Sequence, residues 1–169
     1  MEKAIELIKT YEGIKDGNEM VPGLQPYICP TGHPTIGWGY KLRQYKSGLW
    51  EHPVTKAAIK DWKTVTISRE EADRLVRIEA TKIENTMRDV LPKLPASPQR
   101  DALISFAYNT GIGAFLDSTL KKKVAAQDFA GAAAEFDKWV WGEVGGKKVK
   151  LAGLIERRKA EKELFTQFE

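Results

Sequence analysis

The longest predicted helix limits the fold most, because both of its ends are marked in the sequence. Ser68 and Glu71 have the spacing of a capping box, in which each side chain bonds the backbone N–H of the other residue. Pro92 and Pro95 stop the helix at its far end. Between these signals, apolar residues recur on one face: Ala72, Leu75, Val76, Ile83, Met87 and Val90. A helix of about 20 residues spans about 30 Å, which is enough to link two lobes.

The rest of the chain fits around this helix as a single, mostly helical domain of the α+β class. Its 169 residues are 42% apolar and 30% charged, which is ordinary for a soluble globular protein. We expect a small N-terminal lobe with a β-hairpin over residues 13–67 and the linking helix over residues 69–91. A helical C-terminal lobe is expected over residues 97–169, with a first helix of residues 2–12 packed on it.

Local signals mark three further helix starts. Ser97 precedes Pro98, which is favoured at the first position of a helix. Ser118 and Asp128 are residue types that commonly cap helix N-termini. We expect the alanine-rich helix after Asp128 to continue through Trp141.

Three segments have weaker signals. Residues 55–62 are predicted to form a short helix. The aromatic residues of this region are expected to pack on the core, and the alternative is that they edge a sugar-binding cleft. Residues 142–150 are predicted to form a loop. A last helix is expected from about Gly153.

The first helix carries a carboxyl group on its apolar face. Its apolar stripe consists of Ala4, Leu7, Ile8 and Tyr11. Glu12 takes the next place on this stripe, and Gly13 ends the helix, so the carboxyl is expected to point inward from the last turn. Burial and the negative end of the helix dipole both favour a protonated carboxyl, the form that a general acid needs. The alternative is a glutamate at a frayed helix end, either solvated or paired with an arginine.

A glycine-punctuated hairpin follows. Tyr27–Ile28 and residues 35–42 are predicted strands, joined by a turn rich in proline and glycine. Gly37 and Gly39 would leave one face of the second strand nearly bare. A flat substrate lying over the sheet would explain this, and so would a hairpin that merely bends.

Three motifs in this order resemble the catalytic signature of the phage-type lysozymes, the muramidase endolysins that include the T-even phage enzyme. They are Tyr11-Glu12-Gly13, Tyr27-x-Cys29-Pro30-x-Gly32 and Thr35-Ile36-Gly37-x-Gly39. Further similarity to the C-terminal lobe of that family lies in residues 99–115 and 118–120, Trp139, and residues 153–161. The resemblance therefore covers nearly the whole chain.

The resemblance implies a lysozyme-like fold and a glycoside hydrolase. Its substrate would be bacterial peptidoglycan, cleaved at the β-1,4 bond between N-acetylmuramic acid and N-acetylglucosamine, and its effect would be lysis of the host cell. Such hydrolysis needs an acid to protonate the leaving oxygen and a group on the other face of the sugar ring. No metal or other cofactor is implied.

The same resemblance assigns the site residues. Glu12 is the expected acid, and Cys29 with Thr35 is expected to hold the attacking water, giving inversion at the sugar. Asn109, at a helix end, is expected to bond an N-acetyl group of the substrate. Tyr40 stands where the family often has histidine and is expected to contact the substrate, and Arg157 is expected to reach Glu12.

The second catalytic group is left open by the sequence. The 16 residues between Glu12 and Cys29 are about twice the usual gap in the family, so residues 16–24 are interpreted as an insertion. A free thiol titrates near pH 8.5 and is mostly neutral at pH 7. Asp16 or Glu19 of the insertion could supply a carboxylate instead, with Cys29 a small buried apolar residue.

Two other functions remain open. A lytic transglycosylase would cleave the same bond with the sugar's own 6-hydroxyl and give an anhydro product. A non-catalytic wall-binding module would bind without cleavage, although Glu12 and Thr35 argue against it.

The composition limits the kinds of molecule that this protein is expected to bind. The formal net charge of +4 suits anionic polymers, but the basic residues form no dense patch and no nucleic-acid partner is expected. No run is long enough for a membrane span, the single cysteine excludes an intramolecular disulfide, and a monomer is expected. The N-terminus reads as an amphipathic helix, not a signal peptide. We therefore expect synthesis in the host cytoplasm and action on the wall after release through a separate membrane lesion.

Overall fold

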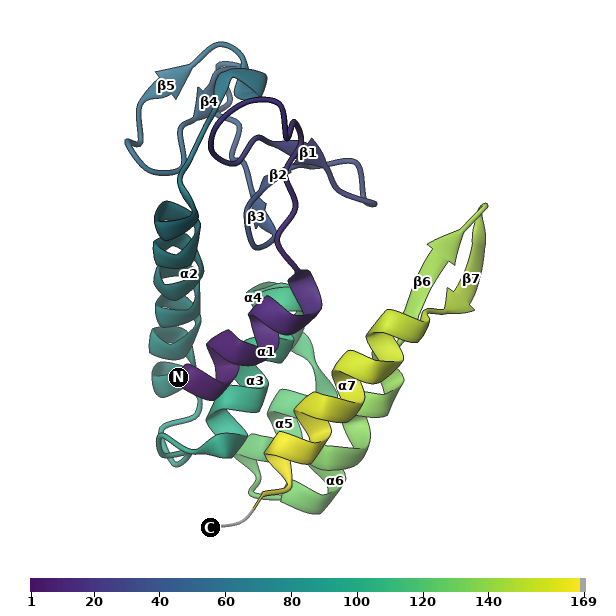
Figure 1. The fold of residues 1–169 in the computed structure, drawn as a ribbon. Helices are drawn as coiled ribbons and strands as arrows, with labels where there is room; N and C mark the ends of the chain where they lie inside the picture. The colour runs from purple at the N-terminus through teal and green to yellow at the C-terminus, as the bar shows by residue number, and fades with distance from the viewer. Residues whose placement is uncertain (168–169) are drawn as a thin grey trace. The chain divides into compact units, whose positions relative to one another are not determined.

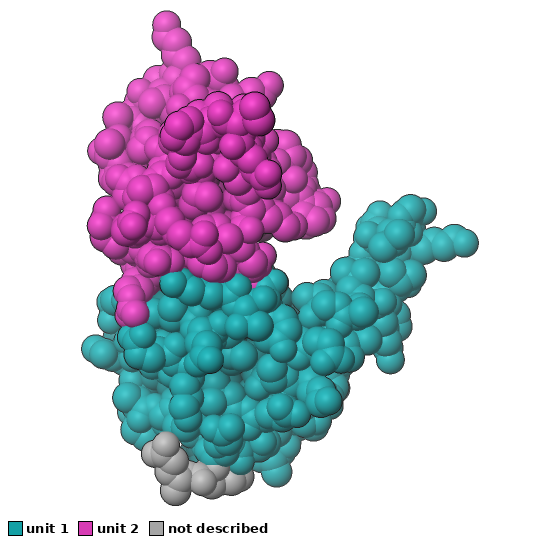
Figure 2. All heavy atoms as spheres, in the orientation of Figure 1, with its two compact units in different colours: residues 1–11, 79–169 teal, residues 12–78 magenta. Residues whose placement is uncertain are grey.

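The computed structural model describes residues 1–167, and these form two compact units. Unit 1 contains residues 1–11 and 79 onward, and unit 2 contains Glu12–Ile78 (Figure 2). The unit boundaries fall within two helices, so each of these helices has residues in both units. The predicted assignment of all these parts to one domain stays a prediction.

Seven α-helices, two 3-10 helices and seven short strands are present in the described residues (Figure 1). The α-helices are α1 (Glu2–Glu12), α2 (Arg69–Val90), α3 (Pro98–Thr110), α4 (Ile112–Asp117), α5 (Thr119–Ala125), α6 (Phe129–Glu135) and α7 (Ala152–Phe165). The 3-10 helices are η1 (Trp62–Thr64) and η2 (Phe136–Lys138). The strands are β1 (Tyr27–Ile28), β2 (Pro34–Ile36), β3 (Tyr40–Lys41), β4 (Trp50–Glu51), β5 (Ala58–Ile59), β6 (Trp141–Val144) and β7 (Lys147–Lys150). They form three antiparallel sheets, in the orders β1-β2-β3, β4-β5 and β6-β7.

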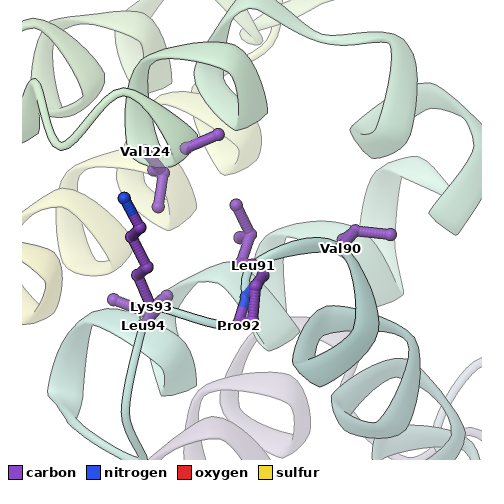
Figure 3. A pocket seen from close by; sticks show the side chains of 7 residues that line it. Val90, Leu91, Pro92, Lys93, Leu94 and Val124 are labelled. Atoms are coloured by element: carbon purple, nitrogen blue, oxygen red, sulfur yellow. The ribbon is translucent and has the colours of Figure 1, made fainter.

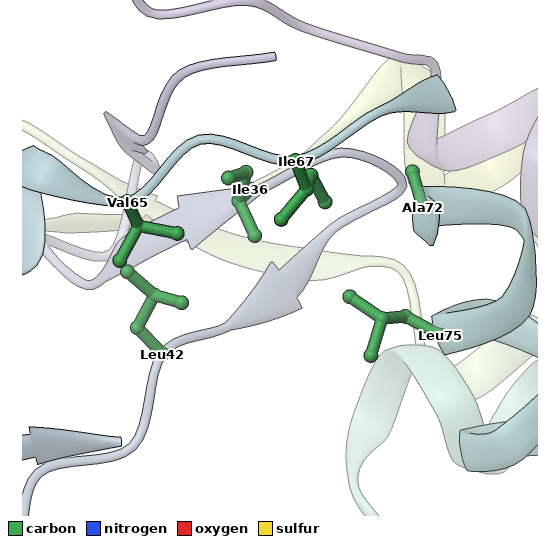
Figure 4. Close-up of a cluster of buried hydrophobic side chains, with 6 residues drawn as sticks. All are labelled: Ile36, Leu42, Val65, Ile67, Ala72 and Leu75. Atoms are coloured by element: carbon green, nitrogen blue, oxygen red, sulfur yellow. The ribbon is translucent and has the colours of Figure 1, made fainter. Parts of the chain in front are cut away.

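Unit 2 is built on a small apolar cluster between its sheet and the first turns of α2 (Figure 4). Its buried members are Ile36, Leu42, Val65, Ile67, Ala72 and Leu75. Trp38, Trp50 and Trp62 are partly buried and pack against it, as predicted for the aromatic residues of the segment after the hairpin. The cluster fixes the position of β2, and therefore of the residues next to it in sequence.

Unit 1 is a helical assembly around α3. Every residue of 100–107 is buried, because other helices of the unit surround this segment. The Phe106 ring meets the rings of Phe115, Phe136 and Trp139 edge-on, with centroids 5.2–6.3 Å apart. Aromatic pairs favour this geometry, and each ring buries a large apolar area.

The predicted helix boundaries at capping residues are confirmed. Ser68 Oγ accepts from Glu71 N at 3.0 Å, and Glu71 Oε2 accepts from Ser68 N at 2.8 Å, so the capping box is complete. The side chains of Ser97, Ser118 and Asp128 each accept a backbone N–H in the first turn of their helices. These caps depend on residues three positions apart, which is why the sequence alone predicts them.

The stripe predicted for α1 is only partly right. Ala4, Ile5 and Ile8 are buried, whereas Leu7 is half-buried. The buried face is therefore rotated toward Ile5 relative to the prediction.

The predicted strand over residues 35–42 is wrong. The chain turns back at residues 37–39, so β2 and β3 are separate antiparallel strands, with Thr35 opposite Lys41 and Ile36 opposite Tyr40. Gly37 and Gly39 have φ of +60° and +77°, a conformation that favours glycine and breaks a strand. The glycines therefore make a turn and not a bare sheet face.

Three other local predictions are also wrong. Residues 55–62 contain strand β5 of the β4-β5 hairpin and only the first residue of η1, not a helix. The helix after Asp128 ends at Glu135, well before Trp141. Residues 142–150 are not a loop, because most of them form the β6-β7 hairpin around Gly145 and Gly146, at φ +58° and +76°. Two successive residues at positive φ make the tight turn that suits a hairpin.

We predict that Ser68→Ala lowers the free energy of unfolding by about 1 kcal/mol, because it removes the acceptor for Glu71 N at the start of α2. Chemical denaturation would measure this change. Ser47→Ala, at an exposed serine in a turn, is the control and should leave stability unchanged. Equal stability of Ser68→Ala and the parent would contradict the assigned role of the box.

Candidate active site

The Glu12 carboxylate lies against the backbone of Gly39, within unit 2. Glu12 is half-buried and is the last residue of α1. A β-carbon built on Gly39 would lie 2.6 Å from Glu12 Oε2 and 3.1 Å from the carboxyl carbon. Any residue larger than glycine at this position would displace the carboxylate. Gly39, for which the sequence left open a substrate or a simple bend, leaves room for the acid.

The turn that contains Gly39 is held on the first turns of α2. Trp38 Nε1 donates to Asp73 Oδ1 at 2.8 Å, and the Arg69 guanidinium lies 5.9 Å from the centroid of the Trp38 ring. A β-carbon built on Gly37 would lie 2.9 Å from the Ala72 β-carbon. These contacts fix the turn from both sides of Trp38, and with it the backbone that faces Glu12.

Tyr27, Cys29 and Thr35 share one face of the small sheet. Tyr27 is directly opposite Thr35 in the β1-β2 register, and Cys29 follows Tyr27 by two residues, so their side chains leave the sheet on the same side. Thr35 is 2% exposed, and its Oγ1 donates to the His33 carbonyl at 2.9 Å. The structure thus brings together two of the predicted site residues, Cys29 and Thr35.

The Cys29 thiol is more acidic than an ordinary cysteine. Burial raises its pKa, but hydrogen bonds from the Thr31 and Thr35 hydroxyls, and from the backbone of His33 and Thr31, lower it to about 7. Cys29 Sγ and Thr31 Oγ1 are 3.1 Å apart. The single Thr35 proton can go either to the His33 carbonyl or to the sulfur. These hydrogen bonds therefore favour the thiolate more than in an ordinary cysteine, and the catalytic role of Cys29 stays a prediction.

Tyr27 belongs to the same electrostatic neighbourhood. Burial raises the pKa of its phenol, and the negative charges of Glu12 and Cys29 raise it further. The Lys15 ammonium lies 5.7 Å from the centroid of its ring. The phenol stays protonated at neutral pH and can donate a hydrogen bond. The sequence indicated Tyr27 only as part of a motif, and its position two residues before Cys29 was the available signal.

The insertion of residues 16–24 is a loop closed by Asp16. Asp16 Oδ1 accepts from Asn18 N at 3.0 Å and from Gln25 N at 2.8 Å, and Gly17 N bonds Gln25 O at 3.0 Å. Glu19 is exposed at the surface of this loop. Asp16 therefore has a structural task, and a catalytic carboxylate from either acid stays a prediction.

Tyr40 lies on the other side of the sheet from Thr35. It is the cross-strand partner of Ile36, and it packs with Ile36 against the apolar cluster of unit 2. The Lys56 ammonium lies 6.0 Å from the centroid of its ring. These contacts give Tyr40 a packing role, and its contact with substrate stays a prediction.

Within unit 1, Asn109 and Arg157 belong to one polar network between α3 and α7. Arg158 Nη2 donates to Asn109 Oδ1 at 2.7 Å, so the amide oxygen is occupied and the amide nitrogen is the group left to donate. Arg157 Nε donates to Glu161 Oε1 at 3.1 Å, and its Nη2 donates to the Ser105 carbonyl at 3.2 Å. Arg157, Arg158 and Glu161 are at most 3% exposed. The predicted contact of Arg157 with Glu12 stays a prediction.

An apolar cavity of about 130 Å³ also lies in unit 1 (Figure 3). Its lining is Val90, Leu91, Pro92, Lys93, Leu94, Val124 and Ala125. The lining holds one ammonium and no acid, so it offers no acid–base chemistry. Within residues 1–167, no three acidic, histidine or cysteine side chains gather as a metal site.

Comparison with known proteins gives one consistent result. The family described as phage lysozyme matches residues 19–161. An endolysin of Acyrthosiphon pisum secondary endosymbiont phage 1 is 34% identical over 164 residues, which cover 97% of this chain and 95% of that protein.

Two solved structures share the predicted mostly helical α+β fold. An endolysin from Escherichia coli O157:H7 phage FAHEc1 has a TM-score of 0.73 at 28% identity, covering 98% of this chain and 92% of that chain. The muramidase domain of SpmX from Asticaccaulis excentricus also has a TM-score of 0.73 at 28% identity, covering 99% of this chain and 97% of that chain.

We predict that Cys29 reacts with iodoacetamide along a titration curve centred at about pH 7, because hydrogen bonds stabilise its thiolate. Cys29 is the single cysteine, so the rate of alkylation reports on it alone. Thr31→Val removes a stabilising hydroxyl and should move the midpoint to higher pH. A midpoint at the ordinary thiol value of about 8.5 in the parent protein would contradict the assignment.

We further predict that Gly39→Ala lowers catalytic turnover by about a hundredfold, because a displaced acid loses its reactive geometry. The matched control is Gly48→Ala, since Gly48 has a similar φ of +86° but nothing within 4 Å of an added β-carbon. Both variants should lose similar stability from backbone strain, and only Gly39→Ala should lose turnover. Equal turnover in the two variants would refute the argument.

Proposed function

Because this chain belongs to the phage lysozyme family, we propose that it hydrolyses the β-1,4 bond between N-acetylmuramic acid and N-acetylglucosamine in bacterial peptidoglycan. Its class of activity, glycoside hydrolysis by a muramidase, follows from the family and from its muramidase-domain neighbour. The observation that carries the proposal is the Glu12 carboxylate against Gly39, in the same unit as Cys29 and Thr35.

In this proposal Glu12 is the general acid. It gives its proton to the glycosidic oxygen as the bond from that oxygen to the sugar C1 breaks. Positioned acids of this kind contribute about 10²–10⁴-fold to rate. The close fit against Gly39 supports this role, because it limits the positions open to the carboxyl group.

The attacking water is held by Thr35 and Cys29. The Thr35 hydroxyl is buried and fixed by the His33 carbonyl, so its oxygen can accept a hydrogen bond from water at a defined position. The Cys29 thiolate can accept the proton that water loses as its oxygen bonds C1, and its negative charge stabilises the cationic sugar. Attack from the face opposite the leaving oxygen inverts the anomeric configuration.

The remaining residues bind the substrate. Arg158 occupies the Asn109 oxygen, which leaves the Asn109 amide nitrogen to donate to an N-acetyl carbonyl. Tyr27 can donate its phenol proton to a sugar oxygen, and Tyr40 contributes through packing or direct contact.

The biological role in this proposal is lysis of the host cell from within. The endolysin relative supports it. Among the described residues, no helix has both the length and the apolar character that a membrane crossing requires. The enzyme would reach the wall after release through a separate membrane lesion. It would act as a monomer without nucleic acid.

We predict that Glu12→Gln lowers cleavage of purified peptidoglycan by at least about a hundredfold, because glutamine cannot supply the proton. Mass spectrometry of the released sugars would show reducing muramic ends from the parent and none above background from the variant. The control is Glu6→Gln, at an exposed position of the same helix, which should cleave like the parent.

Other outcomes of this digestion identify other chemistry. Anhydro ends from the parent would replace hydrolysis with transglycosylation, and no cleavage by the parent would leave only binding. Cys29→Ser should keep part of the activity, whereas Asp16→Asn and Glu19→Gln should keep all of it. Loss of all activity in Asp16→Asn or in Glu19→Gln would show that the second catalytic group lies in residues 16–24.

A further inference from the structure

The β6-β7 hairpin of unit 1 exposes an aromatic ring beside two ammonium groups. Trp141 is 45% exposed. Within residues 1–167 it is the one exposed side chain among the tryptophans, tyrosines and phenylalanines. The Lys148 and Lys150 Nζ atoms each lie 5.4 Å from the centroid of its ring. Figure 1 shows the hairpin extending from the N-terminal end of α7, and Figure 2 shows it as an arm of the teal unit.

The register places these groups on one face of the hairpin. Trp141 is opposite Lys150, and Glu143 is opposite Lys148, so the four side chains lie on the same side. The other face carries Val149, Val144 and Lys147. A β-carbon on Gly142 of that face would clash with Leu151, which therefore covers its base. The Trp141 face, consisting of Trp141, Glu143, Lys148 and Lys150, has no such cover.

The base of the hairpin is anchored, so this face is a defined surface. Leu151 N donates to the Val140 carbonyl at 2.9 Å, directly below the Trp141–Lys150 pair. Val140 is 5% exposed and belongs to the core of unit 1. Trp141 is thus held next to a buried residue and is not at the tip of a free arm.

We propose that the Trp141 face binds the carboxylate-bearing glycan strands of peptidoglycan, as a contact separate from the catalytic residues of unit 2. A flat indole ring packs on the C–H face of a sugar, and the two ammonium groups pair with carboxylates of the attached peptides. The proposal rests on the proposed function only for the identity of the polymer.

The arrangement favours an acidic glycan over an anionic membrane. A membrane-inserting hairpin needs its aromatic residue at the tip, whereas Trp141 pairs with Lys150 at the base, and the tip is Gly145 and Gly146. A surface that binds a ligand only through its negative charge needs no exposed aromatic ring. Glu143, opposite Lys148, offsets part of the positive charge on this face, and the two ammonium groups still leave it with a net positive charge that favours a carboxylate.

The test measures binding to purified peptidoglycan sacculi stripped of teichoic acid. The full-length Glu12→Gln variant serves as the parent protein in this assay, because it should not cut the sacculi. Adding Trp141→Ala should weaken binding about tenfold. Adding Lys148→Ala with Lys150→Ala should weaken it about threefold or more at low salt, and this difference should shrink as salt rises.

Matched controls lie on the opposite face of the same hairpin. Val144→Ala and Lys147→Ala should bind sacculi like the parent. Chitin, an uncharged amino-sugar polymer, should respond to Trp141→Ala but not to the lysine pair. Unchanged binding of Trp141→Ala to sacculi, or equal losses in the controls, would overturn the proposal.

Two further arms separate this inference from its alternatives. If Trp141→Ala loses binding to anionic phosphatidylglycerol vesicles and keeps binding to sacculi, the face contacts membranes and the proposal is overturned. The protein with Glu12 intact is assayed for cleavage of the same sacculi. Absence of cleavage with hairpin-dependent binding would reject the proposed hydrolysis alone, and cleavage with hairpin-independent binding would reject the hairpin proposal alone.

Discussion

The close approach of the Glu12 carboxylate to the Gly39 backbone is the constraint on which unit 2 depends. It requires glycine at position 39, a turn with positive φ there, and contacts that hold this turn in place. These contacts are with the start of α2, where Trp38 donates a hydrogen bond to Asp73 and Gly37 packs against Ala72. The capping box of Ser68 and Glu71 in turn fixes where α2 begins. The predicted acid is thus positioned by a chain of contacts that runs through a helix cap.

Sequence predicted best where the determinants of structure are local. Helix caps at Ser97, Ser118 and Asp128 act through residues three positions away, and all three were found. The turn at residues 37–39 was missed because it is held by a tertiary contact with α2. The alternation of residue types along a strand gives no information about such a contact. The β6-β7 hairpin was missed although Gly145 and Gly146 signal a two-residue turn.

Residues of a candidate site could be named from the sequence, but their contacts could not, and their catalytic roles stay predictions. The resemblance named Cys29 and Thr35, and the structure places them on one sheet face. The acidity of the Cys29 thiol could not be predicted, because it depends on hydroxyl groups that the turn of residues 29–34 brings to the sulfur. The bond from Arg158 to Asn109 likewise joins two helices far apart in the sequence. The lowered pKa of the Cys29 thiol weakens the main objection to cysteine as the partner of Glu12.

The central claim is that Glu12 and a water held by Thr35 and Cys29 act on opposite faces of the sugar. Proton NMR of the muramic reducing ends, recorded in the first minutes of peptidoglycan digestion, tests it most directly. Attack by that water inverts the β bond, so the α anomer should appear first and the β anomer only later, by mutarotation. Initial release of the β anomer would indicate a covalent intermediate and contradict the assigned roles of Thr35 and Cys29.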